Sequence, residues 1–109
     1  MTDKDFYEKM SYKTKYVYDE LTPEQTKEML DLCEKYKSFL NIGKTERECV
    51  SEAEKTAIAN GFSKLDDKAE LKPGDKVYKI NREKNIILAV IGTRSLTDGV
   101  NIVGAHIDS

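Results

Sequence analysis

Apolar positions in the first half of the chain recur at helical spacing. Between residues 5 and 20 the segment is charged and the spacing is loose, which predicts one amphipathic helix. A second helix is expected to begin at Thr22, because Thr22 and Gln25 have the spacing of a capping box around Pro23. Gly43 is placed to end this helix. Its apolar residues recur at steps of three and four and form one stripe: Met29, Leu32, Cys33, Tyr36, Phe39 and Leu40.

A third helix is expected directly afterwards, and its apolar residues are mostly small. Thr45 and Glu48 repeat the capping-box spacing, and Asn60-Gly61 is a typical helix end. Small side chains allow a helix to lie close to a neighbouring element. The pattern therefore predicts a helical region over residues 1–61. The stripe of this third helix consists of Cys49, Val50, Ala53, Ala57 and Ile58.

The second half of the chain has the pattern of strands separated by polar turns. Residues 62–76 form a polar connection, and residues 76–80 are β-prone. A polar loop of hairpin length leads to residues 86–91, whose continuous apolar run predicts a strand buried on both faces. Residues 100–107 predict a further strand. We therefore expect an α/β fold in which N-terminal helices precede the strands of a mixed sheet, with residues 76–109 rich in β structure.

Length and charge narrow the class of protein. A chain of 109 residues is enough for one small domain and too short for two. The 18 Lys and Arg residues and 20 Asp and Glu residues give a net charge of −2, which argues against a nucleic-acid partner held by a basic field. Near the N-terminus Lys residues are interleaved with Tyr residues, a pattern that could stack on nucleic acid. Asp and Glu residues in the same segment largely cancel the lysine charge, so packing is favoured over nucleic-acid binding.

Cysteine usage and apolar run length point to a cytoplasmic protein. The longest apolar run is six residues, far below the roughly 20 that a membrane span needs. The N-terminus also lacks the layout of a signal peptide. Cys33 and Cys49 make neither a disulfide framework nor a zinc quartet. We expect both cysteines to be small buried core residues. We also expect no membrane partner.

The candidate chemistry lies where the last predicted strand ends. Alternate strand residues share a face, so Gly104, His106 and Asp108 would point the same way. His106 and Asp108 would be roughly 6.6 Å apart along the strand. Histidine is a common metal ligand, and a nearby carboxylate can fix its orientation. A short His-x-Asp pattern also arises often by chance, and a surface or capping role is the alternative on composition alone.

Several stretches resemble the aspartyl aminopeptidase family of zinc metallopeptidases. The most specific is Val-Gly-Ala-His-Ile-Asp-Ser at residues 103–109, which is similar to the segment carrying the family's first zinc-ligand histidine and the aspartate two residues on. The resemblance spans essentially the whole chain but only about the first quarter of a full-length member. The other stretches that carry it are residues 36–40, 44–48, 71–78, 85–90 and 100–102.

The resemblance implies a fold and an activity. Residues 1–109 would be the N-terminal portion, and an incomplete part, of a zinc-peptidase-like α/β catalytic domain, helical over 1–61 and β-rich over 76–109. The intact enzyme would be a cytoplasmic metallo-aminopeptidase that releases N-terminal residues, often acidic, from peptide substrates. It would use two bridged metal ions, with zinc as the cofactor, and would assemble as a homo-oligomeric dodecamer.

Only two site residues carry over from that family. His106 would ligate one metal ion, and Asp108 would be a catalytic-site carboxylate that orients a ligand. The remaining ligands and the general base have no counterpart in this sequence. A catalytic zinc takes about three protein ligands, so we expect this chain to be inactive by itself and to bind zinc weakly. The alternative is a small non-catalytic α+β interaction module, in which Asp108 has only a capping role.

Overall fold

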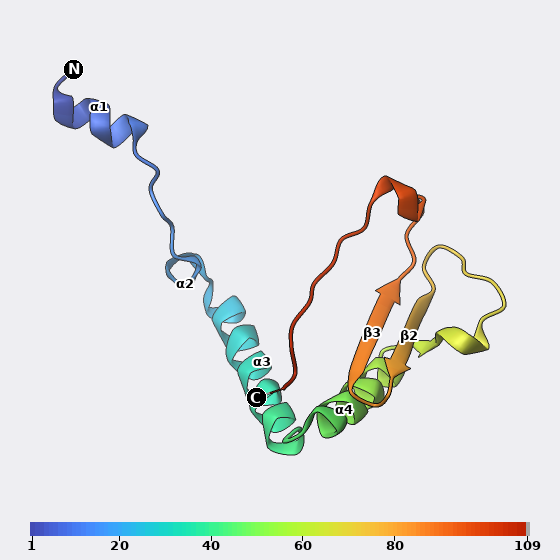
Figure 1. Cartoon of the computed structure of the whole chain (residues 1–109). Coiled ribbons are helices and arrows are strands. Elements are labelled where there is room, and N and C mark those ends of the chain that lie inside the picture. Colours follow the sequence, from blue (N-terminus) through green and yellow to red (C-terminus); the bar gives the residue numbers. More distant parts are fainter. Residues whose placement is uncertain (109) are drawn as a thin grey trace. The chain divides into compact units, whose positions relative to one another are not determined.

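The computed structural model describes residues 1–108, and the chain divides into two compact units (Figure 1). The first unit covers Met1–Lys35 and the second covers Tyr36–Ser109. The boundary falls within a long helix, α3 (Pro23–Ile42).

The first unit begins with two short helices where the sequence pattern predicted one. Helix α1 is Asp3–Met10 and helix α2 is Val17–Glu20. At the start of α1, the Thr2 hydroxyl donates to the Asp5 carboxylate over 2.7 Å, and this bond lowers the pKa of Asp5. At its end, the Ser11 hydroxyl bonds back to a main-chain carbonyl of the preceding turn. Serine competes for helix carbonyls in this way, which explains the early stop.

Helix α3 begins as the sequence predicts, but its apolar stripe is not buried. The Thr22 amide donates to Gln25 Oε1 over 2.9 Å, and the Gln25 amide donates to Thr22 Oγ1 over 3.2 Å, which confirms the capping box. No residue of α3 is buried, and Cys33 is exposed. The expectation of a buried Cys33 is therefore wrong. A helical stripe is buried only where another element packs on it, and the stripe itself cannot specify that element.

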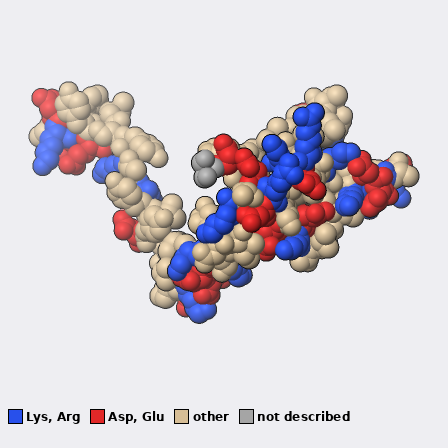
Figure 2. Space-filling model, turned by 60° about the horizontal axis from the view of Figure 1, so that its bottom comes forward, with Lys and Arg blue, Asp and Glu red and all other residues tan. Residues whose placement is uncertain are grey.

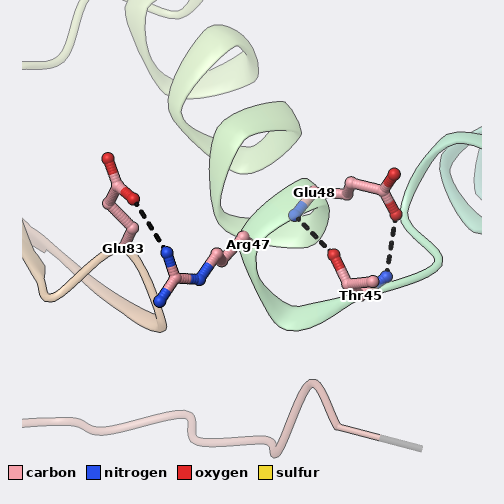
Figure 3. A network of polar contacts seen from close by, with 4 residues as sticks. All are labelled: Thr45, Arg47, Glu48 and Glu83. Carbon is pink, nitrogen blue, oxygen red and sulfur yellow. Dashed lines mark hydrogen bonds and ion pairs between the residues drawn. The ribbon is translucent and has the colours of Figure 1, made fainter.

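The second unit contains helix α4 (Glu46–Ala59), whose start is fixed by polar contacts (Figure 3). The Glu48 amide donates to Thr45 Oγ1 over 3.2 Å, and the Thr45 amide donates to Glu48 Oε2 over 2.9 Å. Next to this capping box, Arg47 Nη1 lies 3.3 Å from Glu83 Oε2, an exposed ion pair between α4 and a turn of the sheet. The predicted start of this helix is confirmed.

The sheet has three strands in the order β1-β2-β3. Strand β1 (Ser63–Lys64) pairs in parallel with β2 (Lys76–Asn81), and β2 pairs antiparallel with β3 (Asn85–Val90), so the sheet is mixed as expected. Strand β1 falls within the segment predicted to be a polar connection. Two 3-10 turns complete the unit: Leu65–Asp67 and Leu96–Asp98.

The core lies between α4 and the sheet. Its buried side chains are those of Cys49, Val50 and Ala57 from α4, and Val77 and Tyr78 from β2. The burial of Cys49 is thus as predicted. The Tyr78 hydroxyl donates to Glu54 Oε1 over 2.7 Å and joins the helix to the sheet. This hydrogen bond, together with burial, raises the pKa of Tyr78.

Two predictions about the β region are wrong. The apolar run 86–91 is not buried on both faces, because Ile87 and Val90 are 67% and 62% exposed. Residues 100–107 form no strand, and their described side chains are exposed. Both errors have one cause: within residues 1–108 no strand pairs with the outer edge of β3 or with residues 100–107. An apolar run can indicate a buried strand but cannot supply its neighbour.

Among the described helices, none combines the length and the apolar character that crossing a membrane requires.

Candidate functional site

The two residues singled out by the sequence lie in contact. His106 and Asp108 belong to the extended segment that comes after the last 3-10 turn. His106 Nδ1 is 3.0 Å from Asp108 Oδ1 and 3.1 Å from the main-chain oxygen of the same residue. The pair was expected on one face of a strand. The structure brings the two side chains together without a strand, because they are only two residues apart in an extended segment.

The contact determines which imidazole nitrogen is available to a ligand. An ionised carboxylate and a carbonyl can only accept hydrogen bonds, so Nδ1 is the donor. The neutral imidazole then carries its lone pair on Nε2, the nitrogen through which a histidine backed by a carboxylate binds a metal ion. The His106 side chain is 87% exposed and that of Asp108 is 66% exposed. Neither side chain is enclosed by the described part of the chain.

The residues present fit part of a zinc site. His106 is the one histidine of the sequence, and its Nε2 is open. Within residues 1–108, no three His, Cys, Asp or Glu side chains lie close enough together to hold a metal ion. A catalytic zinc takes about three protein ligands. The described residues therefore offer one histidine with a carboxylate behind it, which is fewer side chains than such a site needs.

A second feature was not found by sequence reasoning. An apolar groove of about 500 Å³ lies between α4 and the β2–β3 hairpin. At its rim, Lys76 Nζ lies 3.2 Å from the Asn60 carbonyl oxygen and 5.8 Å from the centre of the Phe62 ring. The sequence feature that could have indicated this groove is the small-residue stripe of α4, because the short side chains of Ala53 and Ala57 leave the groove open. The other residues that line it are Phe39, Thr56, Leu88 and Val90.

Charge is mixed over the surface. On the face seen in Figure 2, Lys and Arg side chains alternate with Asp and Glu side chains. Several of these charges are paired across the second unit, as in the contact of 2.6 Å between Lys79 Nζ and Asp66 Oδ1. Exposed pairs of this kind contribute little stability, about 0–1 kcal/mol each.

Comparison with solved structures shows what kind of protein has this fold. A crystal structure of aminopeptidase I from Borrelia burgdorferi B31 superposes with a TM-score of 0.79 and 37% identity, over 84% of this chain and 23% of that chain. An M18 family aminopeptidase from Thermotoga maritima superposes with a TM-score of 0.75 and 33% identity, over 91% of this chain and 21% of that chain. The fold is that of a part of these aminopeptidases.

Sequence comparison gives the family. The model of the M18 family, described as aminopeptidase I zinc metalloprotease, matches residues 39–109, more than half of the chain. A protein of Clostridium acetobutylicum named "Probable M18 family aminopeptidase 1" is 46% identical over 99 residues, and one of the same name from Borreliella burgdorferi is 38% identical over 89 residues. This chain belongs to the M18 family of aminopeptidases. The resemblance seen in the sequence is thereby confirmed.

The chain spans about one fifth of the length of these relatives. The alignment covers 87% of this chain but 21% of the Clostridium acetobutylicum protein, and 82% of this chain but 19% of the Borreliella burgdorferi protein. His106 and Asp108 both fall inside the stretch that the family model matches.

Proposed function

We propose that this chain supplies part of the active site of a metal-dependent aminopeptidase, which releases N-terminal residues from peptides and accepts acidic residues among them. The observation that carries the proposal is the contact between His106 and Asp108 inside the region matched by a family of zinc metalloproteases. In this proposal His106 binds zinc through Nε2. Asp108 is a positioning residue that holds Nδ1 and keeps the lone pair on the ligating nitrogen.

The chemistry follows from the metal and from these two residues. A bound zinc ion supplies Lewis acidity toward a peptide carbonyl and a water molecule. His106 contributes a neutral nitrogen ligand, Nε2, and Asp108 raises the basicity of this nitrogen through its 3.0 Å contact with Nδ1. We further propose two metal ions per site, a homo-oligomeric assembly and a cytoplasmic location for the intact enzyme.

We also propose that the 109-residue chain is inactive by itself. The reason is the donor set, because three potential ligands do not come together within residues 1–108. Titration of this chain with zinc should therefore give no stoichiometric submicromolar binding, and the His106→Ala variant should behave like the parent. A one-to-one submicromolar site that disappears in His106→Ala would contradict this proposal.

Activity is tested by completing the chain. The 109 residues are fused to the region of the Clostridium acetobutylicum relative that lies after its aligned stretch, and the zinc-loaded protein is assayed on aspartyl, glutamyl and leucyl p-nitroanilides. We expect His106→Ala to abolish hydrolysis. We expect Asp108→Asn to lower kcat/KM by about 10- to 100-fold, the usual cost of losing the group behind a ligand. Asp98→Asn, which removes an exposed carboxylate from the Leu96–Asp98 turn, serves as the control and should have no effect.

The result that refutes the proposal is specific. If the fused protein is folded and hydrolyses substrate equally well with His106→Ala, then His106 is not a metal ligand. If the fused protein hydrolyses leucyl but neither acidic substrate, the family activity stands and the acidic preference is wrong.

A further inference from the structure

Helix α4 ends at the one asparagine of the sequence that is followed by glycine, Asn60-Gly61. The residue after an asparagine decides how easily the next main-chain nitrogen reaches the side-chain carboxamide. Glycine has no side chain to obstruct that approach, whereas the other asparagines are followed by isoleucine or arginine. Asn60 and Gly61 are both exposed to water. Asn60 is therefore the asparagine of this chain that is most open to intramolecular attack.

The reaction at such a pair is deamidation, which releases ammonia. The Gly61 main-chain nitrogen forms a bond to Cγ of Asn60, and the bond from Cγ to Nδ2 breaks. The leaving NH2 group takes up the proton of the attacking nitrogen and departs as ammonia. Water then opens the five-membered succinimide ring. Opening at the side-chain carbonyl gives aspartate, and opening at the main-chain carbonyl gives isoaspartate, whose main chain is longer by one CH2 group.

In the folded chain, both reacting groups are held by hydrogen bonds to the last turn of α4. The Gly61 amide donates to the Ile58 carbonyl oxygen over 3.0 Å. Asn60 Nδ2 donates to the Thr56 main-chain oxygen over 2.8 Å. Gly61 has φ 84°, the left-handed conformation with which many helices end. The nitrogen and the carboxamide cannot turn toward each other until this turn opens.

The last turn can open while the rest of α4 stays in place. Helix ends open at a much smaller free-energy cost than a packed core. The buried side chains Cys49 and Val50 hold the first half of α4, far in the sequence from Asn60. We propose that Asn60 is a deamidation site whose reaction is controlled by opening of the last turn of α4, and not by unfolding of the whole second unit.

The isoaspartate product cannot restore the native end of α4. In the native chain, the Phe62 amide donates to the Ala57 carbonyl oxygen over 3.0 Å, and Lys76 Nζ lies 3.2 Å from the Asn60 carbonyl oxygen. An additional CH2 group in the main chain displaces the atoms that make both contacts. Strand β1 begins one residue after Phe62, so the displacement extends to the edge of the sheet. The isoaspartate form should therefore be less stable than the parent.

Peptide mapping by mass spectrometry tests the proposal on the 109-residue chain. The chain is incubated at mildly alkaline pH, both folded and unfolded in urea, and deamidation is followed at Asn60 and at Asn101. Asn101 is also exposed but precedes isoleucine, so it serves as the internal control. Asn60 should react faster than Asn101, and about 10-fold more slowly in the folded chain than in urea. The proposal is overturned if Asn60 reacts no faster than Asn101, or equally fast in both states.

A matched pair of glycine variants identifies which opening controls the rate. Thr56 lies in the last turn of α4 and Ser51 nearer its start, and both residues are exposed. Glycine weakens a helix to a similar extent at both positions. Thr56→Gly should increase the rate at Asn60 about 2-fold, whereas Ser51→Gly should leave it unchanged. An equal increase in both variants would mean that the whole unit must unfold, and no increase in either would mean that the turn gives no protection. Both results overturn the proposal.

Thermal unfolding tests the effect of the product. Freshly prepared Asn60→Asp carries the new charge without the additional CH2 group, so it is the control for the isoaspartate fraction separated from incubated protein. The isoaspartate fraction should have a lower Tm than Asn60→Asp. Equal Tm values would show that the longer main chain does not disturb the end of α4, and would overturn this part of the proposal.

Discussion

Removal of the Tyr78 hydroxyl should weaken the attachment of α4 to the sheet. Tyr78 is 4% exposed, and its hydroxyl donates to Glu54 Oε1 over 2.7 Å. A hydrogen bond to a charged group contributes about 1.5–3 kcal/mol. Glu54 is only partly buried and can regain water, so Tyr78→Phe should lower the free energy of unfolding by about 1–2 kcal/mol. For a domain of this size, that loss corresponds to a Tm lower by about 4–16 °C.

The pH dependence provides an independent signature. The hydrogen bond to Glu54, together with burial, raises the pKa of Tyr78 in the folded chain above the value of about 10 in the unfolded chain. The contribution of Tyr78 to stability is therefore complete below pH 10, and it is lost as the pH rises through the folded-state pKa. Tyr78→Phe should lose less stability than the parent above pH 10.

Urea unfolding between pH 7 and 11 measures both effects. Glu54→Gln keeps an acceptor but removes its charge, and the double variant completes a thermodynamic cycle. We expect a favourable coupling energy at pH 7 that decreases above pH 10. The reasoning is refuted if Tyr78→Phe is as stable as the parent at pH 7, or if both proteins lose the same stability on the alkaline side.

Two further substitutions test the packing and the turn of the second unit. A Cβ at Gly43 would lie 2.7 Å from Cys49 Sγ and 3.3 Å from the Phe39 carbonyl oxygen, so Gly43→Ala should cost about 1–3 kcal/mol in urea unfolding. Cys49→Ala should lower the free energy of unfolding less in the Gly43→Ala background than in the parent, because it removes the sulfur that the new Cβ meets. Equal losses in the two backgrounds would show that the two side chains do not clash. Glu83 has φ 59°, a left-handed backbone conformation that favours glycine. Because the exposed ion pair of Glu83 with Arg47 contributes little, Glu83→Gly should raise the free energy of unfolding by about 0.5–1 kcal/mol. A lower free energy of unfolding in this variant would contradict the prediction.

Features set by neighbouring residues could be predicted from the sequence. The capping boxes at Thr22 and Thr45 were found because each joins residues three apart. The β2–β3 hairpin was found because a short polar loop separates two β-prone runs. The contact between His106 and Asp108 is local in the same sense, since the two residues are only two positions apart. The sequence analysis placed the two residues on one face of a strand and did not predict their direct contact, and the zinc ligand role of His106 remains a proposal.

Features that depend on a distant partner could not be predicted. Cys33 lies on an apolar stripe but is exposed. Its exposure could not be predicted, because the spacing of apolar residues does not show which element packs against a helix. Residues 100–107 have a strand-like composition but form no strand, because pairing needs a second chain segment. The two residues of β1 are too few to show any alternation, and their parallel pairing with β2 depends on residues more than ten positions away. The groove was missed because a stripe of small residues indicates close packing and an open groove equally well.

The three-residue connection between β2 and β3 has a consequence for the order of folding. Tyr78 pairs with Leu88 and Ile80 pairs with Ile86, so the hairpin forms from contacts between residues that are close in the chain. Hairpins of this kind form in about 1–10 μs, and α4, which packs on the hairpin, precedes β2 in the chain with only β1 and one 3-10 turn between them. We expect α4 and the hairpin to be the nucleus, since low contact order speeds folding. Any strand that joins β3 then adds to a template that is already in place.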